Sequence, residues 1–114
     1  MNRIDARELV HEVLPRLRAT RHLVETTLRV RLEACHDAAE RRRLQALQEA
    51  FALEMTMIRL NLEHLLRRYA EQLDAARREE GQGHGLMLSL DDAEAAAIER
   101  IRQLHARARR LQTG

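Results

Sequence analysis

The chain has 114 residues, of which 45% are hydrophobic, 33% are charged and only 2% are aromatic, and its formal net charge is +2. This composition fits one helical domain with a core of aliphatic side chains, and it excludes a membrane-embedded or a disordered chain. All 20 basic residues are arginine, which excludes lysine Schiff-base chemistry and a Walker-type phosphate loop.

The first expected helix covers residues 3–35 and bends at Pro15, the only proline of the chain. It ends at Cys35, the only cysteine, so an internal disulfide and a multi-cysteine metal site within one chain are excluded. We expect Cys35 to be a buried structural thiol, with a ligand or redox role as the alternative.

The second expected helix covers residues 38–80. Asp37, with Glu40 three residues later, forms a capping box that starts this helix, and no proline or glycine follows before residue 81. The apolar residues at helical spacing predict one face that packs in the core. This face consists of Leu44, Leu47, Phe51, Met55, Ile58, Leu62, Leu65, Tyr69 and Leu73.

The third expected helix covers residues 90–112. It follows a glycine-containing loop over 81–88, and Ser89 with Asp92 is expected to cap it. The three helices predict an all-α fold, in which a long antiparallel helical hairpin is joined by a shorter third helix.

The first two helices each carry a second apolar stripe besides the face that packs in the core. The expected turns place Ala97 level with Leu73 and Leu111 level with Ile58, so the third helix would not reach these stripes. We therefore predict a partner interface, most simply in a homodimer whose two hairpins form a four-helix bundle. The predicted interface residues are Leu23, Thr27, Val30, Ala46, Ala50, Leu53, Met57 and Leu60.

Two polar residues lie between the two stripes of the second helix. Glu54 would point toward the centre of the bundle, where a carboxylate must be paired, protonated or bound to a metal. Pairing with Arg21 or Arg31 is the structural interpretation, and a carboxylate or metal site shared across the two-fold axis is the functional one. Asn61 is expected to specify the helical register.

Three histidines are weak candidates for a metal or haem site. The expected register brings His11, His64 and His105 to a similar level, one on each helix, and imidazoles are suitable ligands for zinc and haem iron. Because His11 lies on the outer face of its helix, solvated histidines are the simpler interpretation. We therefore predict no cofactor, and no metal site beyond these weak candidates and Glu54.

The third expected helix is rich in arginine. Its candidate phosphate contacts are Arg102, Arg107, Arg109 and Arg110, although cations near a helix C-terminus also interact favourably with the helix dipole. Because aromatic side chains for base stacking are missing, any nucleic-acid binding would involve the backbone of a duplex.

These patterns favour a non-enzymatic interaction or regulatory module, such as an adaptor, a chaperone or an anti-activator, that acts as a homodimer. A small nucleic-acid-binding regulator is the alternative, and a metal- or haem-binding helical bundle comes third. No enzymatic activity is expected, because the sequence offers no recognisable nucleophile–base pair or glycine-rich phosphate loop. The sequence has no run of 18 apolar residues and no signal-peptide core, so we expect a cytoplasmic protein without a membrane partner.

Overall fold

The computed structural model describes residues 2–78 and 86–113, and most of these residues are helical. The predicted all-α class is confirmed, with the addition of a small two-stranded sheet. Along the chain the elements are β1 (Arg3–Asp5), α1 (Ala6–Glu8), the π-helical turn η1 (Leu9–Val13), α2 (Leu14–Ala34), α3 (Ala38–Arg68), α4 (Ala70–Arg78), β2 (Met87–Ser89) and α5 (Asp92–Thr113).

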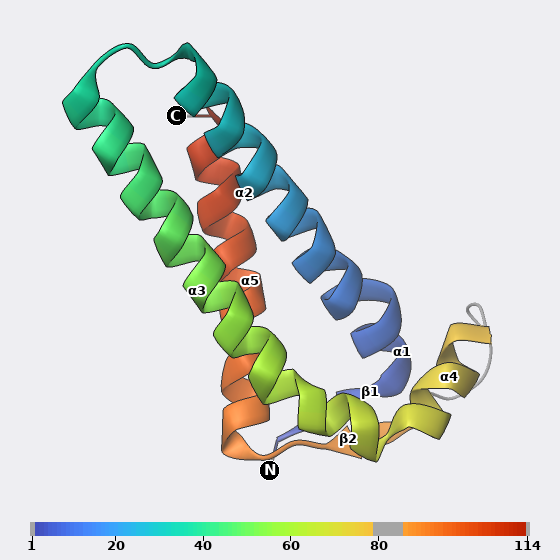
Figure 1. Cartoon of the computed structure of the whole chain (residues 1–114). Coiled ribbons are helices and arrows are strands. Elements are labelled where there is room, and N and C mark those ends of the chain that lie inside the picture. Colours follow the sequence, from blue (N-terminus) through green and yellow to red (C-terminus); the bar gives the residue numbers. More distant parts are fainter. Residues whose placement is uncertain (1, 79–85, 114) are drawn as a thin grey trace.

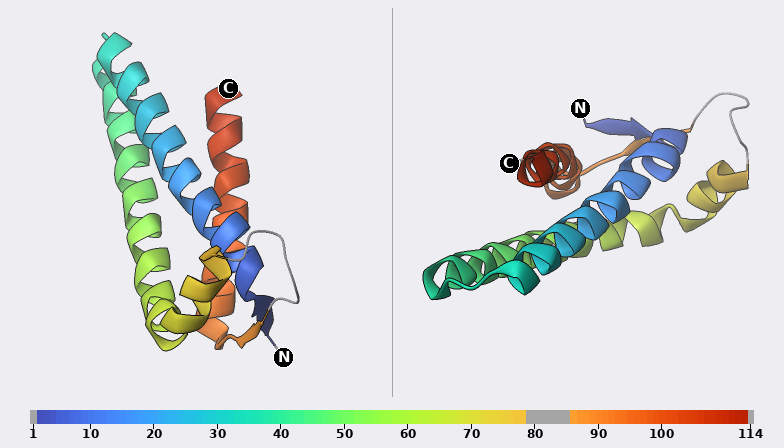
Figure 2. Two further views of the ribbon diagram at one scale, coloured as in Figure 1. Left: turned by 90° about the vertical axis from the view of Figure 1, so that its right-hand side faces the viewer. Right: turned by 90° about the horizontal axis from the view of Figure 1, so that it is seen from above.

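Helices α2 and α3 form the predicted antiparallel hairpin, and α5 lies against one face of it (Figures 1 and 2). The short elements gather at the open end of the hairpin, together with the N-terminus, whereas the C-terminus lies near the turn between α2 and α3. Every long helix contributes to one core of aliphatic side chains. Its fully buried members include Leu9, Leu28, Leu44, Leu62, Leu65, Leu73, Leu88, Ile101 and Leu104.

Helix α3 starts where the sequence predicts. Asp37 has an extended backbone, and its carboxylate accepts a hydrogen bond of 2.9 Å from the backbone N–H of Glu40. The N–H groups of a first helical turn have no partner within the helix, so this cap stabilises the turn between α2 and α3. We expect Asp37→Ala to lower the free energy of unfolding by about 1 kcal/mol, measured by urea denaturation. Asp74→Ala, which removes an exposed aspartate from inside α4, is the control.

The expected start of the first helix at residue 3 is wrong. Residues 3–5 form strand β1, which pairs antiparallel with β2 so that Ile4 lies opposite Leu88. Both of these side chains are buried, whereas their neighbours along the strands are exposed or half-buried. The alternation covers only three residues in each strand, which is too short to be recognised in the sequence. The loop expected over 81–88 therefore ends in part of a strand, and residues 81–85 lie outside the described residues.

The helix widens just before Pro15 into the π-helical turn η1. Here the backbone N–H of Leu14 donates to the carbonyl of Leu9, five residues earlier, instead of four. Proline has no backbone N–H and its ring crowds the preceding turn, so a wider turn at this point accommodates it. The distortion expected at Pro15 is therefore found in the turn that precedes it.

The second expected helix, 38–80, is interrupted at Tyr69. The backbone of Tyr69 departs from helical geometry (φ −114°, ψ 27°), and its hydroxyl accepts a hydrogen bond of 3.3 Å from the backbone N–H of Ser89. After this break α4 turns toward the N-terminal segment, where the His11 ring lies 3.0 Å from the carbonyl oxygen of Ala76. Residues 79 and 80 lie outside the described residues.

The expected register of the third helix is wrong as well. Glu94, near the start of α5, contacts Arg68, and Arg107 contacts Glu54. Near the end of α5, the carbonyl oxygen of Leu111 accepts a hydrogen bond from Arg31. Because α3 stops at Arg68 and α4 folds aside, α5 begins level with Arg68 and extends close to the turn between α2 and α3.

Candidate functional site

An apolar stripe covers the outer side of helix α3. Of its large side chains, Leu53 is 62% exposed, Met57 55% and Leu60 56%, and the small residues Ala46 and Ala50 are exposed too. We call these five residues the α3 stripe. Their spacings alternate between four and three residues, which is the heptad pattern of a helix that packs along another helix.

The other side of the same helix packs in the core. Phe51, Ile58, Leu62 and Leu65 are buried there, as the sequence predicts. Helix α3 therefore has two apolar faces, and the packing of the described chain uses only one of them. Large apolar side chains at regular helical spacing on a surface are typical of an interaction site.

The α2 residues of the predicted interface are less accessible. Leu23 and Thr27 are half-buried, and only Val30 is exposed, at 55%. Helix α5 packs against α2 as well as α3, and Arg31, one turn beyond Thr27, binds the Leu111 carbonyl. The expectation that the third helix would not reach this part of the hairpin is therefore wrong. The readily accessible part of the predicted interface is the α3 stripe.

Glu54 borders the α3 stripe, and its partner differs from the one expected. Its carboxylate lies 3.1 Å from Arg107 of α5, not beside Arg21 or Arg31. The guanidinium of Arg107 also lies over the ring of Phe51, 5.1 Å from its centre. This ion pair joins α3 to α5. Asn61 is exposed and lines a shallow groove between the same helices.

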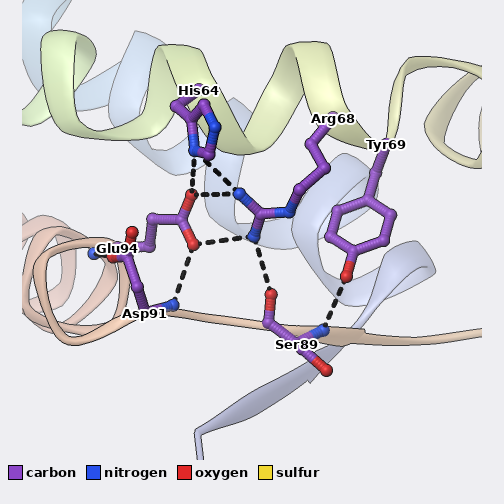
Figure 3. A network of polar contacts seen from close by, with 6 residues as sticks. All are labelled: His64, Arg68, Tyr69, Ser89, Asp91 and Glu94. Atoms are coloured by element: carbon purple, nitrogen blue, oxygen red, sulfur yellow. Dashed lines mark hydrogen bonds and ion pairs between the residues drawn. The ribbon is translucent and has the colours of Figure 1, made fainter.

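A polar network joins the end of α3 to the start of α5 (Figure 3). The Glu94 side chain is only 1% exposed, and its two oxygens accept hydrogen bonds of 2.9 and 3.1 Å from Arg68. The backbone N–H of Asp91 donates to Glu94 at 2.9 Å, and the carboxylate of Asp91 accepts from the Glu94 N–H at 2.7 Å. These reciprocal bonds form a capping box. The cap of α5 is therefore Asp91 with Glu94, and the expected pair Ser89 and Asp92 is wrong.

The network determines the protonation of Glu94. Burial alone would raise the pKa of its carboxyl, but the hydrogen bonds from Arg68 and from the Asp91 backbone hold that pKa below its usual value of 4.5. Glu94 is therefore ionised at neutral pH, and its charge is balanced by the guanidinium of Arg68. The ion pair between buried Glu94 and partly exposed Arg68 joins the start of α5 to the end of α3.

His64, Asp91 and Glu94 form a cluster of metal-ligand type within the described residues. The His64 Nδ1 atom lies 3.5 Å from a Glu94 oxygen and 2.8 Å from Arg68 Nη1. Both Glu94 oxygens already accept hydrogen bonds from Arg68. A cation bound here would lie beside that guanidinium and would compete with it for the same oxygens. Capping and ion pairing account for the geometry of these three residues.

The three candidate histidines do not come together. His64, on α3, lies beside Glu94 at the start of α5. His105 lies eleven residues beyond Glu94 along α5, which is about 16 Å of helix. Burial, and then the charges of Arg16 and Arg109, lower the pKa of His105. His11 contacts the carbonyl of Ala76 instead. The expected common level of these side chains is therefore wrong.

Cys35 lies at the turn between α2 and α3 and packs against the core, but it is half-buried and not buried as expected. Its thiol donates a hydrogen bond of 3.3 Å to the backbone carbonyl of Asp37. Arg41 closes the same turn by donating to the carbonyls of Leu32 and Cys35. These contacts give Cys35 a place in the turn structure.

The four arginines of α5 that were predicted to contact phosphates divide into two groups. Arg102 forms ion pairs with Glu8 and Glu99, at 3.0 and 3.6 Å, and Arg107 forms one with Glu54. Arg109 and Arg110 are exposed near the C-terminal end. Two of the four candidate phosphate contacts are therefore engaged in ion pairs within the chain, which weakens their attraction for an anion.

The sequence interpretation missed two features beside these sites. One is the network around Glu94, for which Asp91 and Glu94 supplied the three-residue spacing of a capping box. The other is a groove of about 310 Å³ between α2 and α3, for which the sequence contains no recognisable signal. Its lining residues are Leu17, Arg18, Arg21, Glu25, Ala52, Met55, Thr56 and Arg59.

Within residues 2–78 and 86–113, none of the helices combines the length and the apolar character needed to span a membrane. Comparisons of the chain with protein-family models, with curated proteins and with solved structures found no match.

Proposed function

We propose that the protein is a non-enzymatic interaction module of the adaptor, chaperone or anti-activator type, and that it acts as a homodimer through the α3 stripe. The observation that supports this proposal is the exposed heptad pattern of Ala46, Ala50, Leu53, Met57 and Leu60. A helix that only covered a core would have polar side chains on its outer face. A second helix laid along the stripe would remove the apolar side chains from water.

The size of the stripe suggests a moderate affinity. Complete burial of a Leu or Met side chain contributes about 1.5–3 kcal/mol, and the three large side chains are already about half-buried in the single chain. Pairing two stripes would therefore bury the exposed half of six such side chains, and the cost of association offsets a large part of that gain. We expect dissociation in the micromolar range or above, which would make assembly sensitive to protein concentration.

Sedimentation velocity tests the proposal directly. The wild type is expected to sediment as a dimer at concentrations of tens to hundreds of micromolar, and Leu53→Glu as a monomer, because burying an unpaired charge in an apolar seam is costly. Gln45→Glu makes a charge change on the exposed surface of the same helix outside the stripe, and it should sediment like the wild type. A wild type that stays monomeric throughout this concentration range would overturn the proposal.

Nucleic-acid binding has less support, because Arg102 and Arg107 are engaged in ion pairs. Arg109 and Arg110 are the exposed members of the predicted set. Metal or haem binding has less support still, because His11, His64 and His105 point to different surroundings.

A further inference from the structure

We infer that the two copies of the chain pair their α3 helices antiparallel, in the register that places the two-fold axis between residues 51 and 52. This inference rests on the proposed dimer and specifies the partner: the same helix of a second copy, running in the opposite direction. Two independent properties of α3, the sizes of the stripe residues and the charges beside them, select this arrangement.

The stripe changes size along its length. Its N-terminal part consists of Ala46 and Ala50, and its C-terminal part consists of Leu53, Met57 and Leu60. Antiparallel heptad packing in this register would set Ala50 level with Leu53 of the partner subunit, and Ala46 level with Met57 of the partner subunit. These layers, formed by Ala46, Ala50, Leu53 and Met57, would each combine a small side chain with a large one, which favours close packing in the middle of the seam.

Parallel packing would place side chains of the same size opposite each other. Ala46 and Ala50 would each face their own copies, and the helices would have to approach closely at that end. Leu53, Met57 and Leu60 would also face their own copies, and these larger side chains would hold the helices apart. A straight helix such as α3 cannot lie close to its partner at one end of the stripe and far from it at the other.

The charges beside the stripe select the same arrangement. Arg42, Glu49, Thr56 and Glu63 follow one another at intervals of seven residues, and all four are exposed. In the inferred register Arg42 would lie beside Glu63 of the partner subunit, and Glu49 beside Thr56 of the partner subunit. A shift by one heptad would bring Glu49 beside Glu63 of the partner subunit instead. The inferred register brings opposite charges together and the shifted register brings like charges together, so the charges favour the inferred register.

The parallel alternative has a charge conflict as well. It would bring Glu49 close to Glu54 of the partner subunit, because the two residues flank the stripe on opposite sides.

The surroundings of α3 leave room for the inferred pairing. The turn at Tyr69 directs α4 toward α1, away from the outer side of α3.

Cross-linking of single cysteines tests the orientation in the full chain. We start from Cys35→Ala and introduce either Ala46→Cys or Met57→Cys, and treat each variant with a bifunctional thiol reagent that spans about one interhelical distance, 8–10 Å. In the inferred register residue 46 lies level with residue 57 of the partner subunit, but it is displaced from its own copy by about 16 Å along the axis. Cross-linked dimer is therefore expected in a refolded mixture of the two variants and not in either variant alone.

The possible outcomes distinguish a dimer with another helix orientation from the absence of a dimer. Sedimentation of the same samples reports whether they are dimeric. Dimers in which each variant cross-links alone would overturn the antiparallel inference and leave the proposed function standing. Monomers in both samples would overturn both.

A charge reversal tests the register. Arg42→Glu and Glu63→Arg are each expected to weaken the dimer by about two- to tenfold, and the double variant to recover most of this loss. Glu63 also pairs with Arg67 of its own chain at 3.1 Å, so the comparison that decides is the double variant against Glu63→Arg. A double variant that dimerises no better than Glu63→Arg would overturn the inferred register.

Discussion

Replacing Leu65 with alanine is expected to lower the free energy of unfolding by about 3 kcal/mol. The Leu65 side chain is completely buried in the core between α3 and the rest of the bundle. Its truncation removes apolar contacts and leaves a cavity that the surrounding helices fill only in part. Urea denaturation of Leu53→Glu with and without Leu65→Ala measures the effect in a monomer, so that dissociation does not contribute.

Leu60→Ala is the matched control on the same helix. Its side chain is 56% exposed, so the same truncation should change the stability of the monomer by less than about 0.5 kcal/mol. In the otherwise wild-type chain, however, Leu60→Ala should weaken the dimer, because Leu60 belongs to the α3 stripe. Equal destabilisation of the monomer by the two substitutions would contradict the assignment of the two faces of α3.

Glu94→Gln is expected to lower the free energy of unfolding by about 2 kcal/mol. The amide keeps the shape of the side chain but removes the charge that pairs with Arg68 and one acceptor of its hydrogen bonds. Arg68 is partly open to water, which keeps the loss below that of a fully buried ion pair. Glu99→Gln, a change on the exposed side of the same helix, should have little effect.

The loss of stability in Glu94→Gln should depend on pH in a defined direction. The pKa of Glu94 is lower in the folded protein than its ordinary value of 4.5. Ionised Glu94 therefore stabilises the fold above pH 4.5, and this contribution disappears as the pH falls through the lowered pKa. The difference in stability between the wild type and Glu94→Gln should be constant near neutral pH and should shrink in acid. A difference that grows in acid would contradict the role of the ion pair.

The helical faces could be predicted because burial follows the period of the helix. Phe51, Ile58, Leu62 and Leu65 are spaced to form one side of a helix, and all are buried. The cap at Asp37 could be predicted because its carboxylate binds a backbone N–H only three residues away. Both features depend on residues that are close together in the sequence.

The features that could not be predicted depend on distant residues. The break at Tyr69 is accompanied by a hydrogen bond from Ser89, and the strand at Ile4 requires Leu88 as its partner. Neither contact is visible in the local pattern around either residue. The register of α5 depends on the break, and the partner of Glu54 depends on that register. One missed interruption therefore changed the surroundings of the predicted site.

The pairing of β1 with β2 is a contact between segments far apart in the sequence, and such contacts close late in folding. The backbone of Arg3–Asp5 has its partner in Met87–Ser89, and next to this sheet Asn2 contacts Asp92, 90 residues later in the sequence. The hairpin of α2 and α3 joins segments that are neighbours in the sequence, so its closure costs less chain entropy than the closure of the sheet. The N-terminal strand has to find residues 87–89, which are more than 80 positions away. A hairpin that closes first would leave Ile4, Leu9 and the inner face of α3 without their cover until the distant segments meet.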